Sequence, residues 1–126
     1  MYEKKIPKDF SCGMAVLMEI IGGKWKSYLL FLISSGIRRP SELHRQIPTA
    51  TARVLNLQLK ELEFHGIIQK EIYPELPPRS EYSLTALGQS LMPVINAMDA
   101  WGSGHVGEFQ QLMERKSEAL LSSEKT

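Results

Sequence analysis

The first third of the chain contains two segments with the apolar spacing of amphipathic helices. In residues 12–21 the apolar side chains recur at i, i+3, i+4 and i+7, which predicts a helix with one buried face. Gly22 and Gly23 end this helix, since glycine commonly follows a helix C-terminus. A second helix is predicted from about Lys24 to Ser35, with Gly36 after it. The positions predicted to be buried in these two helices are Met14, Leu17, Met18, Ile21, Trp25, Leu29, Leu32 and Ile33.

A short helix and a longer helix follow, separated by a turn of about four residues. Pro40 and Ser41 begin the short helix, because proline is tolerated in a first turn where its missing N–H would have no partner. The longer helix begins at Thr51, a favoured N-cap residue, and ends at Gly66. Its predicted buried face consists of Leu55, Leu59 and Leu62. This order of elements is typical of a helix-turn-helix.

A β-hairpin is predicted directly after the longer helix. Residues 67–73 and 79–84 show partial period-2 alternation with strand-forming residues between. The proline-rich segment 74–78 cannot pair as a strand, so it forms the loop of the hairpin. A hairpin in this position is a wing. The expected fold class is therefore mainly α with a small β-wing (α+β), a winged helix-turn-helix.

The rest of the chain, about residues 86–121, predicts two more amphipathic helices, with Thr85 as the first cap and a break at Gly102-Ser103-Gly104. Their apolar surface exceeds what one small winged core needs, and such a surplus commonly packs against a second copy. We therefore expect one domain, residues 1–126, that forms a homodimer through its N- and C-terminal helices. The predicted interface residues are Leu17, Leu91, Ile95, Met98, Trp101 and Phe109.

Length and composition describe an ordinary globular chain. It has 126 residues, of which 43% are hydrophobic and 23% charged, and this suits one domain with one core. No apolar run approaches the roughly 20 residues that span a bilayer, and no segment resembles a signal peptide. We expect a cytoplasmic protein that does not associate with membranes.

The net charge of +1 conceals an uneven distribution. Residues 1–60 hold ten Lys and Arg against four Asp and Glu, a net +6, whereas residues 61–126 hold five against ten, a net −5. A basic half indicates a polyanionic partner, although solvated surface charge can produce the same division.

The outer face of the longer helix has residue types that suit the major groove of DNA. If the leucine face is buried, Ala52, Arg53, Asn56 and Lys60 lie opposite it. Arginine can bond guanine, asparagine can bond adenine, and alanine can touch a thymine methyl. The hydroxyl of Thr51 and the free N–H groups at this helix end suit phosphate. The alternative is an ordinary amphipathic helix with a polar outer face, which the neighbouring turn and wing make less favourable.

Further DNA contacts are predicted outside this helix. Arg79, at the end of the wing loop, suits a narrow minor groove, which attracts arginine. Phosphate contacts position a protein without reading sequence, and plain solvated charge is the alternative for each residue. The candidates are Lys24, Lys26, Arg38, Arg39, Ser41 and Arg45.

Signatures of catalysis and metal binding are missing from the sequence. His44, His65 and His105 do not have metal-ligand spacing, and a single cysteine cannot build a structural zinc site. The sequence has no nucleophile elbow, no Gly-rich phosphate loop and no HExxH pair. We therefore expect no enzymatic activity, no metal and no cofactor.

Several short motifs between Cys12 and Gly102 are specific when taken together. They are Ile21-Gly22-Gly23-Lys24-Trp25, Glu42-Leu43, Ile47-Pro48, Gln58-Leu59, Glu61-Leu62-Glu63, Tyr73-Pro74, Pro77-Pro78-Arg79, Glu81-Tyr82-Ser83-Leu84-Thr85, Leu87-Gly88 and Trp101-Gly102. In these motifs the chain resembles the HxlR family of bacterial winged helix-turn-helix regulators, relatives of the MarR group. It departs from the family pattern at Gly13, Pro40, Ala50-Thr51 and Leu57.

The resemblance implies a dimeric transcriptional regulator that binds double-stranded DNA, with an inverted-repeat operator as the expected target. The helix from Thr51 would read the major groove and the wing around Arg79 would lie beside the minor groove. The departures affect the expected target sequence more than the fold. The alternative is a winged helix that binds other proteins and has no operator, which the basic excess of residues 1–60 disfavours.

Some members of this family sense oxidants or electrophiles through an N-terminal cysteine, which here is Cys12. A single cysteine excludes an internal disulfide and leaves a buried thiol, a reactive thiol or a bridge between chains. Reactivity requires the thiolate, which a helix N-terminus favours. The effector, whether an oxidant or a small molecule, stays open.

Overall fold

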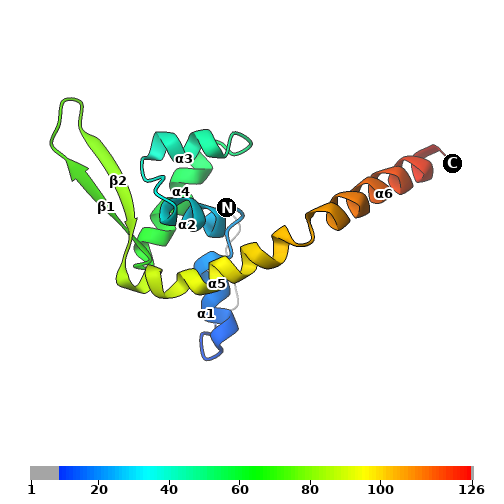
Figure 1. The fold of residues 1–126 in the computed structure, drawn as a ribbon, viewed down its shortest axis with the longest axis horizontal. Helices are drawn as coiled ribbons and strands as arrows, with labels where there is room; N and C mark the ends of the chain where they lie inside the picture. Colours follow the sequence, from blue (N-terminus) through cyan, green and yellow to red (C-terminus); the bar gives the residue numbers. More distant parts are fainter. Residues whose placement is uncertain (1–8, 126) are drawn as a thin grey trace. The chain divides into compact units, whose positions relative to one another are not determined.

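The computed structural model describes residues 9–125, which form helices and a single hairpin in the predicted order (Figure 1). The chain divides into two compact units, one ending at Met92 and the other starting at Pro93. The elements are α1 (Gly13–Ile21), α2 (Lys26–Ser34), α3 (Pro40–Gln46), α4 (Ala52–Phe64), β1 (Ile68–Tyr73), β2 (Arg79–Leu84), α5 (Ala86–Ser103) and α6 (Val106–Lys125). The predicted winged helix-turn-helix is confirmed.

The core of the first unit is built on α2 and α4, which pack against each other. The predicted leucine face of α4 is fully buried, and α2 also packs against β2 of the wing. The side chains with the least exposure are Leu29, Leu30, Ile33, Leu43, Ile47, Leu55, Leu59, Leu62, Ile67 and Ile68. The core therefore fixes α4 with its opposite face outward.

The predicted buried face of α1 is only partly correct. Ile21, at the C-terminal end of α1, is buried, but Met14 and Met18 are more than half exposed. The apolar spacing correctly predicts the helix. Within the first unit, however, α1 packs mainly on α2, and this contact does not cover Met14 and Met18. The protomer therefore leaves apolar side chains of α1 in solvent.

Local signals fix both ends of α4. Thr51 is the N-cap, and its hydroxyl oxygen accepts a hydrogen bond from the Val54 N–H at 3.2 Å. Gly66 has a φ of 74°, a left-handed conformation that favours glycine. The N–H of Ile67 donates to Leu62 O and that of Gly66 donates to Glu63 O, the paired bonds of a Schellman motif.

The wing is an antiparallel pair whose register runs from Ile68 opposite Leu84 to Tyr73 opposite Arg79. Its base is joined to the segment just before α3, because the Tyr82 N–H donates to Arg38 O at 2.8 Å. The predicted alternation holds only at this base, and Ile72 is mostly exposed. The outer part of the wing thus extends into solvent.

The second unit contains the larger part of α5 and all of α6. The predicted break lies where α5 ends at Ser103, and His105 stacks on Trp101 with ring centroids 4.3 Å apart. Many apolar side chains of α6 are exposed, namely Val106, Phe109, Leu112, Met113, Leu120 and Leu121. Among the described helices, none is both long enough and apolar enough to span a membrane.

Candidate nucleic-acid interface

The outer face of α4 presents the residues that the sequence predicts for DNA contact. Ala52, Arg53, Asn56 and Lys60 are all exposed. Leu57 lies opposite the buried leucines and is 56% exposed, so an apolar side chain sits between these polar ones. The arrangement offers an arginine, an amide and an ammonium group for polar contacts and one aliphatic group for a methyl.

Asn56 is connected to α3 by a side-chain hydrogen bond. Nε2 of His44 lies 3.0 Å from Oδ1 of Asn56, and the ring nitrogen donates when it carries the proton. This contact leaves both amide N–H groups of Asn56 available to other acceptors. Sequence reasoning treated His44 only as a histidine without metal partners, because a contact between α3 and α4 has no signature in either helix alone.

Two contacts from α4 hold the start of α2. Gln58 Oε1 accepts the backbone N–H of Trp25 at 2.8 Å, and the Lys26 ammonium donates to Glu61 Oε2 at 2.7 Å. Gln58 therefore satisfies a donor at the N-terminal end of α2 that its own helix cannot satisfy. The pair of contacts fixes the orientation of α4 relative to α2.

The prediction that Lys26 contacts DNA is wrong. Lys26 is only 4% exposed, and its ammonium group is directed at Glu61 within the protein. A cation committed in this way is not available to a phosphate. Its neighbour Lys24 is exposed, with Nζ 5.1 Å from the centre of the Trp25 ring, and stays available for phosphate contact.

A hollow of about 460 Å³ lies between the N-terminal end of α3 and the wing. Arg39, the N-cap residue of α3, and Ser41 in its first turn line one side, and the wing loop with Arg79 lines the other side. Three residues predicted separately for DNA contact therefore surround one open space. Nothing in the sequence groups them, because the two walls, residues 39–41 and 75–80, lie 34 positions apart at their nearest.

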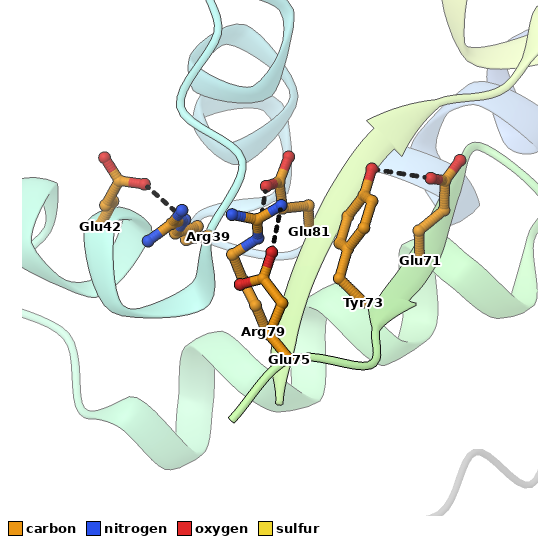
Figure 2. A network of polar contacts seen from close by, with 7 residues as sticks. All are labelled: Arg39, Glu42, Glu71, Tyr73, Glu75, Arg79 and Glu81. Carbon is orange, nitrogen blue, oxygen red and sulfur yellow. Dashed lines mark hydrogen bonds and ion pairs between the residues drawn. The ribbon is translucent and has the colours of Figure 1, made fainter. Parts of the chain in front are cut away.

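Arg79 is the first residue of β2 and is held by carboxylates of the wing (Figure 2). Its Nη2 lies 3.4 Å from Glu75 Oε1 and its Nε lies 3.0 Å from Glu81 Oε2. The Nε–H does not point along the second contact, which is therefore an ion pair rather than a hydrogen bond. The guanidinium carbon lies 4.6 Å from the ring centre of Tyr73, its partner across the strands.

The same network continues to Glu71 on β1 (Figure 2). The hydroxyl of Tyr73 donates to Glu71 Oε2 at 3.0 Å. This hydrogen bond, together with the negative charge of Glu71, raises the pKa of Tyr73. Across the hollow, Arg39 is more weakly paired, with Nε 3.9 Å from Glu42 Oε1. Arg39 is therefore freer than Arg79 to meet an anion.

Cys12 is exposed and is the N-cap residue of α1. The backbone N–H groups of Ala15 and, to a smaller extent, Met14 lower the pKa of its thiol. Of the three states that the sequence left open, the structure removes the buried thiol. The thiol is both accessible and biased toward the thiolate.

Of the residues predicted for a dimer interface, most are accessible within one protomer. Met98, Trp101 and Phe109 are exposed, whereas Leu17 and Leu91 are half-buried. Ile95 differs, because it is only 3% exposed. A side chain covered in this way offers little surface to a partner, so Ile95 is a weaker interface candidate than the other five.

The fold and this exposed face define a winged helix-turn-helix regulator of transcription. The sequence profile of HxlR-like helix-turn-helix proteins matches residues 20–110, so the chain belongs to the HxlR-like helix-turn-helix family. Its relatives are transcriptional regulators, and this chain is a regulator and not an enzyme.

Two relatives from Bacillus subtilis (strain 168) show the extent of the similarity. The uncharacterized HTH-type transcriptional regulator YkvN is 45% identical over 95 residues, which cover 75% of this chain and 80% of YkvN. The uncharacterized HTH-type transcriptional regulator YdeP is 40% identical over 125 residues, which cover 94% of this chain and 98% of YdeP. Among solved structures, the redox regulator HypR in its oxidized form matches with a TM-score of 0.71 and 42% identity, covering 74% of this chain and 96% of HypR.

Proposed function

We propose that this regulator is a sequence-specific DNA-binding protein whose α4 enters the major groove of double-stranded DNA. The observation that carries the proposal is the exposed outer face of α4, with Arg53, Asn56 and Lys60 opposite a fully buried leucine face. The hollow lined by Arg39, Ser41 and Arg79 supports it, since it offers cations to a phosphate backbone on either side of an open space.

We propose that the protein acts as a homodimer, with residues 1–126 forming one functional domain. Support comes from the apolar side chains that α1 and α6 leave exposed within the protomer, among them Met14, Phe109 and Leu120. Exposed apolar area of this kind marks an interaction site. A two-fold dimer would read an inverted repeat with half-sites about 34 Å apart, one turn of DNA. The proposed site of action is the cytoplasm, where bacterial operators lie.

We further propose that Cys12 makes the regulator responsive to oxidants. Support comes from its exposure, from the lowered pKa of its thiol and from the similarity to the redox regulator HypR. The product would be either a mixed disulfide with a small thiol or a bridge across the dimer. In a Cys12→Ser protein, DNA binding should no longer respond to a mild oxidant. An unchanged response would refute the proposal.

The test of DNA recognition is a binding-site selection from random duplex DNA at physiological salt, followed by variants of α4. An inverted repeat should be recovered. Arg53→Ala should then weaken binding by about 1–3 kcal/mol and relax the preference at one base pair. Lys116→Ala, which removes an exposed cation from α6, is the matched control and should change neither quantity. Weak, salt-sensitive binding without any preferred sequence would favour a protein-interaction module instead.

A further inference from the structure

The outer wing has an unexpected charge for a surface that approaches DNA. Residues 68–84 contain three glutamates, Glu71, Glu75 and Glu81, against Lys70 and Arg79. The wing is therefore net negative, although the phosphate backbone attracts cations and repels carboxylates. Because these glutamates are repelled by the phosphate backbone, their presence on the wing requires a separate explanation.

Part of the acid is explained by the strands themselves. Glu71 and Glu81 are direct partners in the register of the wing, and like charges directly opposite each other destabilise a strand pair. The Arg79 guanidinium and the Tyr73 hydroxyl each bind one of these carboxylates. Glu81, whose side chain is only 23% exposed, is therefore explained by its ion pair with Arg79 within the hairpin.

Glu75 has a different position. It lies in the wing loop rather than on a strand, its side chain is 52% exposed, and its contact with Arg79 Nη2 is the longer one at 3.4 Å. An exposed pair of this length is weak and is exchanged readily for another anion. Glu75 also lines the hollow that Arg39 and Ser41 share with Arg79.

We propose that Glu75 acts as a stand-in for a DNA phosphate. In the free protein it pairs with Arg79 while the guanidinium lies over the ring of Tyr73, and a phosphate of the bound duplex must displace it. Glu75 thereby lowers the affinity for DNA of any sequence. Arg79 then contacts a phosphate only when the bound duplex places that phosphate close enough to displace Glu75. This inference rests on the proposed DNA-binding function and makes Glu75 a positioning residue that acts through Arg79.

The size of the effect follows from the release of counterions. One additional phosphate contact steepens the dependence of log K on log salt by about 0.9, which corresponds to about fivefold in affinity near 0.15 M salt. Glu75→Gln should therefore bind random duplex DNA about fivefold more tightly than the wild type, with the slope steeper by about 0.9. Glu75→Asp keeps the charge and should stay closer to the wild type.

The experiment measures fluorescence anisotropy of a labelled random duplex at several salt concentrations. Glu71→Gln is the matched control, because it removes the same charge from an exposed wing residue that pairs with Tyr73 rather than with Arg79. The same Glu75→Gln change is also made in an Arg79→Ala background, where it should have almost no effect.

Three results would overturn the inference. An unchanged affinity of Glu75→Gln means that Glu75 does not restrain Arg79. An equal gain in Glu71→Gln, or a gain that persists in the Arg79→Ala background, means that only the general negative field of the wing was reduced. If the wild type binds the duplex and responds to Arg53→Ala, these results leave the proposed function intact. A wild type that binds no duplex DNA overturns both.

Discussion

The Lys26–Glu61 pair, in which only the ammonium group is buried, should respond very differently to the loss of its acid and to the loss of its base. Lys26 is 4% exposed, whereas the Glu61 side chain is 45% exposed. Glu61→Gln leaves an ammonium group in the interior without a counter-charge. Lys26→Met leaves a carboxylate that water already reaches, and it keeps an aliphatic side chain of similar length in the buried position.

The magnitudes follow from which charge remains. Removing one partner from a buried pair costs about 3–5 kcal/mol, and because the glutamine oxygen can still accept one hydrogen bond we expect about 3 kcal/mol for Glu61→Gln. Lys26→Met leaves only a solvated carboxylate and should cost about 1 kcal/mol or less. The double variant has no buried charge and should resemble Lys26→Met, which gives a coupling energy of about 3 kcal/mol between the two sites.

Urea unfolding at one fixed protein concentration measures these differences, since the stability of the proposed dimer would depend on concentration. With a slope of about 2 kcal/mol per molar urea, Glu61→Gln should lower the midpoint by roughly 1.5 M. Glu63→Gln, the same change two residues away at an exposed position of α4, should stay within about 0.5 kcal/mol of the wild type. If Glu61→Gln lowers the free energy of unfolding no more than Lys26→Met or Glu63→Gln does, the reasoning is refuted, because burial of the ammonium group then does not determine the loss of stability.

Three further predictions concern the N-cap of α4, the close contact between Gly88 and the backbone at Ile67, and the Cys12 thiol. Thr51→Ala should destabilise the protein by about 1 kcal/mol in thermal unfolding, because a first-turn N–H loses its acceptor, while Thr51→Ser should not. Gly88→Ala should cost about 2–3 kcal/mol by urea unfolding, since its Cβ would lie 2.1 Å from Ile67 O, whereas Gly107→Ala meets nothing within 4 Å and should be neutral or stabilising. The alkylation rate of Cys12 should rise at lower pH in the folded protein than in urea, because its folded pKa is lowered; coincident profiles would contradict this.

The sequence predicted the elements well because their signals are local. Thr51 and Gly66 bound α4 through bonds to residues three to five positions away, and Pro40 begins α3 as expected. The leucine spacing of α4 identified the buried face, and so also the exposed one. Periodicity and caps therefore sufficed for the helix-turn-helix and for the outer face of its second helix.

What the sequence did not predict depends on contacts between distant segments. Lys26 reads as an exposed cation until Glu61, 35 residues away, is placed beside it. The pairing of Arg79 requires the strand register, which sets Tyr73 opposite it. Charge and periodicity identify which residues are polar or apolar, but only the tertiary fold decides which of them reach solvent.

The motifs that connect this chain with its family mainly fix the fold, and this has a consequence for recognition. Gln58 and Glu61 lie on α4 but face α2. Gly23 leaves room for Gln58 and for the side chain of Lys26, since a Cβ there would lie 3.0 Å from Gln58 Oε1 and from Lys26 Cδ. These residues set the orientation of α4 and are not available to bases. If α4 reads DNA as proposed, differences in target sequence arise on its outer face, where Leu57 departs from the polar residue usual in the family. Because it is 56% exposed, we expect it to favour a thymine methyl at the base pair it meets.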